Sequence, residues 1–137
     1  MDFNLSLKSR EISMNYEENL LFTKDHVWMK KKQENIFQLG ITNFAQDLLG
    51  DIVFIDIEIN KVIEAGQPLG SIESVKTASD FICPDLCTIR SINKHILKSP
   101  ELINDNPYQT WICEVEFAAE IRPEKFLTHQ KYEESIG

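Results

Sequence analysis

Residues 73–80 read Glu-Ser-Val-Lys-Thr-Ala-Ser-Asp and set one lysine, Lys76, among small and acidic side chains. The neighbouring segments 70–72 and 81–82 contain strand-forming residues, whereas the middle lacks bulky side chains that could pack. This pattern predicts a tight hairpin with Lys76 exposed at its tip. An amide bond to the lysine nitrogen would remove its charge and make the four-carbon stem a tether for a prosthetic group. The alternative is an ordinary solvated lysine on a surface turn.

The elements around this segment are those of one small domain. The chain has 137 residues, of which 42% are hydrophobic and 26% charged, enough for a single core. A formal net charge of -8 argues against nucleic acid and against an anionic membrane surface as partners, because both attract clustered Lys and Arg. An acidic carrier that docks on basic patches fits this charge, and so does acidity that only keeps a small monomer soluble.

The polar residues 1–18 show no sustained periodicity, so we expect a flexible N-terminal extension followed by one domain at 19–137. No apolar run is long enough for a secretory signal or a membrane span. Acidic residues within the first 18 also disfavour a mitochondrial transit peptide. We therefore expect a cytoplasmic, bacterial-type protein.

Period-two alternation predicts a mainly β fold. We expect strands at 21–29 and 36–41 joined across the polar residues 30–35, and the clearest strand at 51–59, where Val53, Ile55, Ile57 and Ile59 alternate with other residues. Further strands are expected at 62–63, 88–93 and 111–117, with turns at 60–61 and 83–87 and a loop through 99–107.

Two helices are expected from capping signals. Thr42 or Asn43 can begin a short helix that ends at Gly50, with Phe44 and Leu48 on its buried face. After Pro123, residues 124–134 form an amphipathic stretch typical of a terminal helix. Short, closely spaced strands with few helices favour a small all-β barrel or sandwich that presents Lys76 on one hairpin.

No catalytic or metal site is expected. The three histidines are isolated from one another, Trp28 and Trp111 are typical of packing residues, and neither a Gly-rich phosphate loop nor a nucleophile elbow occurs. The odd set of three cysteines contains no Cys-x-x-Cys pair, which favours reduced packing residues. A disulfide between Cys83 and Cys87 across a turn stays open as the alternative.

The Lys76 segment resembles the lipoyl-attachment segment of the glycine cleavage system H-protein family. Biotin carriers place the lysine between two methionines, and lipoyl domains of 2-oxoacid dehydrogenases usually place aspartate before it; Val75 and Thr77 fit neither pattern. Further segments resemble H proteins in the family's order, between about residues 22 and 117: 25–28, 40–46, 49–54, 64–66, 99–104, 107–108 and 111–112.

This resemblance implies the barrel-sandwich hybrid fold of lipoyl and biotin carriers, with short flanking helices and a C-terminal helix. It implies a covalent lipoyl group, from lipoic acid, on Lys76, with Glu73, Ser74 and Asp80 forming the motif and the environment of the arm. It further implies that the protein is a co-substrate and not an enzyme. Function then lies in the attached group, which carries an aminomethyl group between enzymes.

The implied partners are those of glycine catabolism. They are a glycine decarboxylase (P protein), an aminomethyltransferase (T protein), a dihydrolipoyl dehydrogenase (L protein), and a lipoate ligase or lipoyl/octanoyl transferase. Between partners, the loaded arm is expected to fold into a cleft on the carrier, which shields it from water.

One departure from the family concerns that cleft. Where H proteins usually read His-Glu-Trp, this chain reads His26-Val27-Trp28, and the family's glutamate is among the groups that line the cleft. Valine cannot hold a cation, although Asp80 supplies one carboxylate nearby. The alternatives are therefore an H-like lipoyl relay or a redox-linked lipoyl module outside glycine cleavage, and an interaction module that never carries lipoate. Near residues 58–60, the family's proline-containing loop is shortened, and Asn60 is expected to adopt a positive φ.

Overall fold

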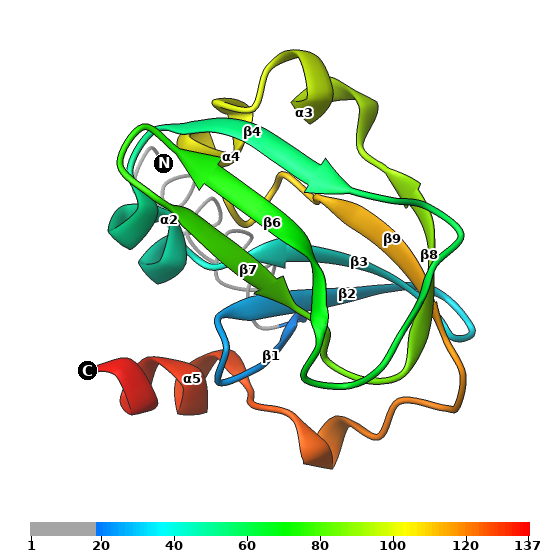
Figure 1. The fold of residues 1–137 in the computed structure, drawn as a ribbon. Coiled ribbons are helices and arrows are strands. Elements are labelled where there is room, and N and C mark those ends of the chain that lie inside the picture. The colour runs from blue at the N-terminus through cyan, green and yellow to red at the C-terminus, as the bar shows by residue number, and fades with distance from the viewer. Residues whose placement is uncertain (1–18) are drawn as a thin grey trace, which may run out of the picture.

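Two antiparallel sheets pack against each other in the computed structural model, which describes residues 19–137 (Figure 1). The larger sheet has the order β1-β2-β3-β9-β8-β5, and the smaller has the order β4-β6-β7. The strands are β1 (Leu21–Phe22), β2 (Val27–Gln33), β3 (Ile36–Ile41), β4 (Ile52–Ile57), β5 (Val62–Ile63), β6 (Pro68–Ser74), β7 (Ala78–Ile82), β8 (Cys87–Ile92) and β9 (Cys113–Phe117). The mainly β prediction is confirmed. The extension predicted at residues 1–18 lies outside the described residues.

The main core fills the space between the sheets. Met29, Leu39 and Val115 of the larger sheet and Ile55 and Ile72 of the smaller one are each at most 5% exposed and belong to one cluster. A second, smaller cluster is formed by Leu20, Phe22, Trp28 and Tyr132. The indole Nε1 of Trp28 donates to the Pro107 carbonyl at 2.9 Å, which confirms Trp28 as a packing residue.

Short helices flank the two sheets. They are α2 (Asn43–Leu49), α3 (Lys94–Lys98), α4 (Leu102–Asp105), the 3-10 turn η1 (Pro123–Lys125) and α5 (His129–Ile136). Figure 1 shows α2 beside the end of the β6–β7 hairpin, and α5 beside β1. The expected loop through residues 99–107 was only partly right, because α4 lies within it.

Three strand predictions need correction. The predicted strand 21–29 is broken by a turn at 23–26, and β2 continues through the polar residues to Gln33, so the turn to β3 contains only Glu34 and Asn35. The predicted strand 51–59 is shorter, and Val53 and Ile59 are about half exposed. A bulge between Ile52 and Phe54 shifts the register and turns Val53 out of the core. The last strand begins at Cys113, two residues later than predicted.

Both helix predictions also need correction. Thr42 caps α2, since its Oγ1 accepts from the Ala45 N–H at 3.2 Å, but Leu48 is 62% exposed and Leu49 is the buried residue. The terminal helix begins only at His129, because Leu127 forms a β-bridge with Phe22 and so cannot continue a helix from residue 124. The turn at Asn60 is as expected, with a φ of 65°.

Candidate functional site: a hairpin lysine beside a cleft

Lys76 lies at the tip of the hairpin that β6 and β7 form. The last paired residues are Glu73 and Ala78, and Val75, Lys76 and Thr77 make the exposed connection. This confirms the hairpin that the sequence predicted, with Lys76 exposed at its apex. Val75 is 68% exposed, so the residue beside the lysine contributes nothing to the core.

Ser74 fixes the backbone of this tip. Its N–H donates to the Thr77 carbonyl at 2.7 Å. Its hydroxyl donates to the same carbonyl at 3.1 Å and accepts from the N–H groups of Lys76 and Thr77, each at 3.2 Å. The serine side chain thus satisfies amides that a tight turn leaves without a strand partner. The Lys76 side chain therefore projects from a backbone turn that four hydrogen bonds of Ser74 hold together.

A hydrogen-bond clamp behind the tip holds the hairpin against α4. The Asn104 side chain donates to the Gly50 carbonyl at 2.8 Å and accepts from the Ile52 N–H at 2.9 Å. Between these two residues, the Asp51 carbonyl accepts from the Val75 N–H at 3.0 Å. The tip is therefore anchored to a helix far along the chain. The sequence predicted Gly50 only as the end of a helix and gave Asn104 no role, although both lie in segments that resemble the family.

Gly50 lies next to the end of the Lys76 side chain. Its φ of 80° is one that other residues adopt only with strain. A Cβ added there would meet Cε of Lys76 at 3.0 Å and Nζ at 3.5 Å. The glycine therefore both ends α2 and leaves space for the lysine stem.

A cleft of about 290 Å³ runs from the tip along β7. Its lining includes Thr77, Ala78, Ser79, Asp80 and Phe81 of the hairpin, and Leu48 and Leu49 of α2. Asp25 and His26, from the turn before β2, line the same cleft. The cleft thus combines an apolar wall with two carboxylates, Asp25 and Asp80.

The structure brings the predicted site residues together. Glu73, Ser74 and Lys76 lie within one turn, and Asp80 lies four residues further along β7 as part of the cleft. Position 27 differs from the expectation, because the Val27 side chain is 1% exposed and packs in the main core instead of lining the cleft. Asp25, two residues earlier, supplies a cleft carboxylate that the sequence did not single out.

His26 connects the cleft to α5. Its Nδ1 and the Tyr132 hydroxyl are 2.8 Å apart, and that hydroxyl is 2.7 Å from Oγ1 of Thr42. Partial burial lowers the pKa of His26, although the neighbouring Asp25 carboxylate opposes this shift. The ring also packs on Phe44, with centroids 4.8 Å apart. This network holds the turn that carries Asp25 in place.

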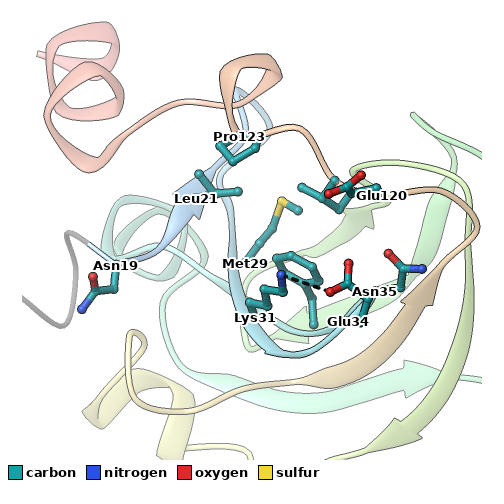
Figure 2. A pocket seen from close by; sticks show the side chains of 10 residues that line it. Asn19, Leu21, Met29, Lys31, Glu34, Asn35, Glu120 and Pro123 are labelled. Carbon is teal, nitrogen blue, oxygen red and sulfur yellow. Dashed lines mark ion pairs between the residues drawn. The ribbon is translucent and has the colours of Figure 1, made fainter.

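Another cleft, of about 250 Å³, lies away from Lys76 (Figure 2). Leu21, Met29 and Pro123 face it, and a Lys31–Glu34 ion pair of 3.8 Å lies at its edge. It shares no residue with the cleft beside the lysine. Within residues 19–137, no helix is both long and apolar enough to cross a membrane.

A two-sheet β fold with an exposed lysine on a hairpin beside a cleft is the arrangement of prosthetic-group carriers. The model of the glycine cleavage H-protein family matches residues 20–137. The chain belongs to the glycine cleavage H-protein family, whose members carry lipoate and are carriers instead of catalysts. Family membership also implies partners within the glycine cleavage system.

Individual relatives agree with this assignment. A glycine cleavage system H protein of Listeria monocytogenes is 42% identical over 125 residues, which cover 90% of this chain and 99% of the relative. One of Bacillus cereus is 40% identical over 123 residues, which cover 88% and 96%. The crystal structure of a glycine cleavage system H protein from Mycobacterium marinum matches with a TM-score of 0.78 and 30% identity, covering 88% of this chain and 98% of that one. The predicted barrel-sandwich fold is confirmed, and no comparison favours the relay alternative.

Proposed function

We propose that Lys76 carries the lipoyl group, in amide linkage to Nζ, and that the protein shuttles an aminomethyl group between enzymes of glycine cleavage. The observation that carries this proposal is the exposed lysine on a hairpin tip whose backbone is fixed by Ser74. Glu73, Ser74 and Asp80 complete the motif around it. A rigid tip lets a modifying enzyme and each partner meet the same lysine in the same geometry.

The residues around Lys76 fit such a group. A Cβ at position 50 would lie 3.0 Å from Cε of Lys76, so the glycine leaves the stem unobstructed. The cleft begins at Thr77 and extends along β7 to Phe81, a span of roughly 13 Å at the usual rise per residue. It therefore lies where an arm that starts at the hairpin tip would turn back onto the domain.

The bound group supplies a dithiolane that opens on two-electron reduction and can bear an aminomethyl group on sulfur. The chain's own residues would hold and protect that cargo. Leu48, Leu49 and Phe81 line the cleft with apolar surface, which limits access of water. Asp25 and Asp80 would supply negative charge for the protonated amine of the aminomethyl group, so Asp25 would take the part that the family's glutamate plays.

The proposed partners follow from this cargo. A glycine decarboxylase (P protein) loads the carrier, an aminomethyltransferase (T protein) unloads it, and a dihydrolipoyl dehydrogenase (L protein) reoxidises it. A lipoate ligase or a lipoyl/octanoyl transferase attaches the group. We place this cycle in the cytoplasm, because the relatives named above are bacterial and three free thiols suit a reducing compartment. We propose that the carrier acts as a monomer.

Exchange of labelled bicarbonate into glycine tests the function. The fully lipoylated protein, with a glycine decarboxylase from a related bacterium, is expected to support exchange. Lys76→Ala should abolish it, and Lys32→Ala, which removes another exposed lysine near a hairpin turn, should leave it unchanged. Exchange by Lys76→Ala would contradict the site, and no exchange by protein of confirmed lipoylation would contradict the aminomethyl role.

A further inference from the structure

Two cysteines face each other where the chain passes from one sheet to the other. Cys83 follows β7 of the smaller sheet, and Cys87 begins β8 of the larger one. Their Sγ atoms are 3.5 Å apart, and both residues are at most 2% exposed. Neither residue belongs to the cleft beside Lys76.

We propose that Cys83 and Cys87 form a redox-reactive dithiol, which a hydroperoxide converts to an intrachain disulfide and a small thiol reductant restores. A disulfide needs a sulfur separation of roughly 2 Å, so the two atoms have to approach by about 1.5 Å. The side chains already point at each other within one short turn. The cross-link would tie the end of β7 to the start of β8 and thereby join the two sheets.

Access separates the roles of the two thiols. A cleft of about 520 Å³ is lined by Cys83 together with Phe22, Gly66, Pro84 and Leu127, whereas Cys87 is not among its lining residues. An oxidant that enters this cleft therefore reaches Cys83 before Cys87. In the proposed reaction Cys83 is oxidised first, and the Cys87 thiol then attacks the oxidised sulfur.

The hydrogen bond between the two thiols supports the same order. The hydrogen bond between the two thiols lowers the pKa of Cys83, although burial opposes this shift, and it raises the pKa of Cys87, so Cys83 loses its proton more readily than Cys87 does. In its protonated form, the Cys83 thiol also donates to the Asp85 carbonyl at 2.9 Å, which holds that side chain in the turn until the proton is lost. A thiolate with a thiol beside it is the arrangement that favours a disulfide over further oxidation.

The chemical steps balance with a hydroperoxide as oxidant. The Cys83 thiolate attacks the peroxide oxygen, the O–O bond breaks, and the leaving hydroxide or alkoxide takes a proton, which leaves a sulfenic acid on Cys83. The Cys87 sulfur then attacks the sulfenyl sulfur, the S–O bond breaks and water leaves. Two thiols have lost two electrons and two protons, and one peroxide bond has been reduced.

Cys113 supplies an internal control. It is fully buried in β9, it lines none of the three clefts described above, and burial raises the pKa of its thiol. Among the described residues, no group of histidine, cysteine and carboxylate side chains is arranged to hold a metal ion. Because it is buried and its thiol has a raised pKa, Cys113 should stay reduced when Cys83 and Cys87 oxidise.

The test treats the folded full-length chain, produced without lipoate so that cysteines supply its only thiols, with hydrogen peroxide. Thiols are then counted after denaturation. Of the three cysteines, only Cys113 should still react, the intact mass should fall by two hydrogens, and peptide mapping should find a Cys83–Cys87 link. Dithiothreitol should restore all three. Three surviving thiols, a link that includes Cys113, or a link between two chains would overturn the proposal.

Variants test the order of the two thiols. In Cys87→Ser, dimedone should label Cys83 as a sulfenic acid, whereas in Cys83→Ser no label should appear on Cys87. Cys113→Ser is the matched control and should form the link as the wild type does. If a variant does not fold, the thiol count and the peptide map of the wild type still decide whether the Cys83–Cys87 disulfide forms. Equal dimedone labelling of both single variants would contradict the assigned order.

Discussion

Replacing Asn104 by alanine tests whether the clamp behind the hairpin tip positions Lys76. The change removes one hydrogen bond to the Gly50 carbonyl and one from the Ile52 N–H, at 2.8 and 2.9 Å. With each bond worth about 0.5–1.5 kcal/mol, the free energy of unfolding should fall by about 1–3 kcal/mol. For a domain of this size, that corresponds to a loss of roughly 3–12 °C in Tm.

Two measurements separate a local effect from a global one. Urea unfolding gives the change in free energy, with an unchanged m value if only stability is affected. Amide hydrogen exchange reports on the Val75 N–H, which donates to the Asp51 carbonyl inside the clamped segment. Its protection should fall by more than that of the Val115 amide in the core of the larger sheet.

Asn106→Ala is the matched control. Asn106 is exposed and follows the same short helix, and its contribution to the helix end comes from its backbone N–H, which alanine keeps. Its unfolding free energy should stay within about 0.5 kcal/mol of the wild type. Equal stabilities of the two variants, or unchanged Val75 protection in Asn104→Ala, would refute the clamp.

Three further predictions concern the cleft and its turns. Gly50→Ala and Gly66→Ala both place a side chain at a positive φ, and each should lower the free energy of unfolding in urea by about 1–2 kcal/mol. Only at Gly50 does the new Cβ meet Lys76, so the NMR signals of the Lys76 side chain should shift in Gly50→Ala and not in Gly66→Ala. Equal shifts in the two variants would contradict the contact. Asp25→Asn should slow glycine–bicarbonate exchange by about two- to fivefold, which corresponds to the loss of a partly exposed ion pair, and should leave lipoylation unchanged. Exchange at the wild-type rate would show that this carboxylate plays no part. Burial keeps the pKa of His26 below its ordinary 6.5, so the folded state binds this proton less readily than the unfolded chain does. The unfolding free energy should therefore decrease as pH falls through 6.5 towards the folded pKa, and His26→Asn, which tolerates the φ of 68°, should flatten that dependence in pH-dependent urea unfolding. An unfolding free energy of the wild type that does not change over this pH range would contradict the lowered pKa of His26.

Local patterns predicted the features that depend on neighbouring residues. Small residues around Lys76 between two strand-like segments were enough to predict the hairpin, and Asn60 was recognised as a residue that accepts a positive φ. Period-two alternation also located β4, but it could not reveal the bulge that exposes Val53, because a bulge depends on how β4 pairs with β6.

Features that join distant segments could not be predicted in this way. Asn104 reaches Gly50 across 54 residues, and nothing near either residue specifies that contact. The terminal helix was placed too early because Leu127 fits an amphipathic stripe, whereas its backbone pairs with Phe22 at the other end of the domain. The role of Asp25 was likewise missed, since only the fold shows that Val27 points into the core while Asp25 lines the cleft.

The most direct test of the account is the site of lipoylation. The full-length protein is co-expressed with a lipoate ligase in the presence of lipoate, its intact mass is measured, and the modified peptide is sequenced by mass spectrometry. The account predicts one lipoyl group, located on Lys76, in the wild type and in Lys32→Ala, and none in Lys76→Ala. An unmodified wild type, or a lipoyl group that Lys76→Ala still acquires, would contradict it.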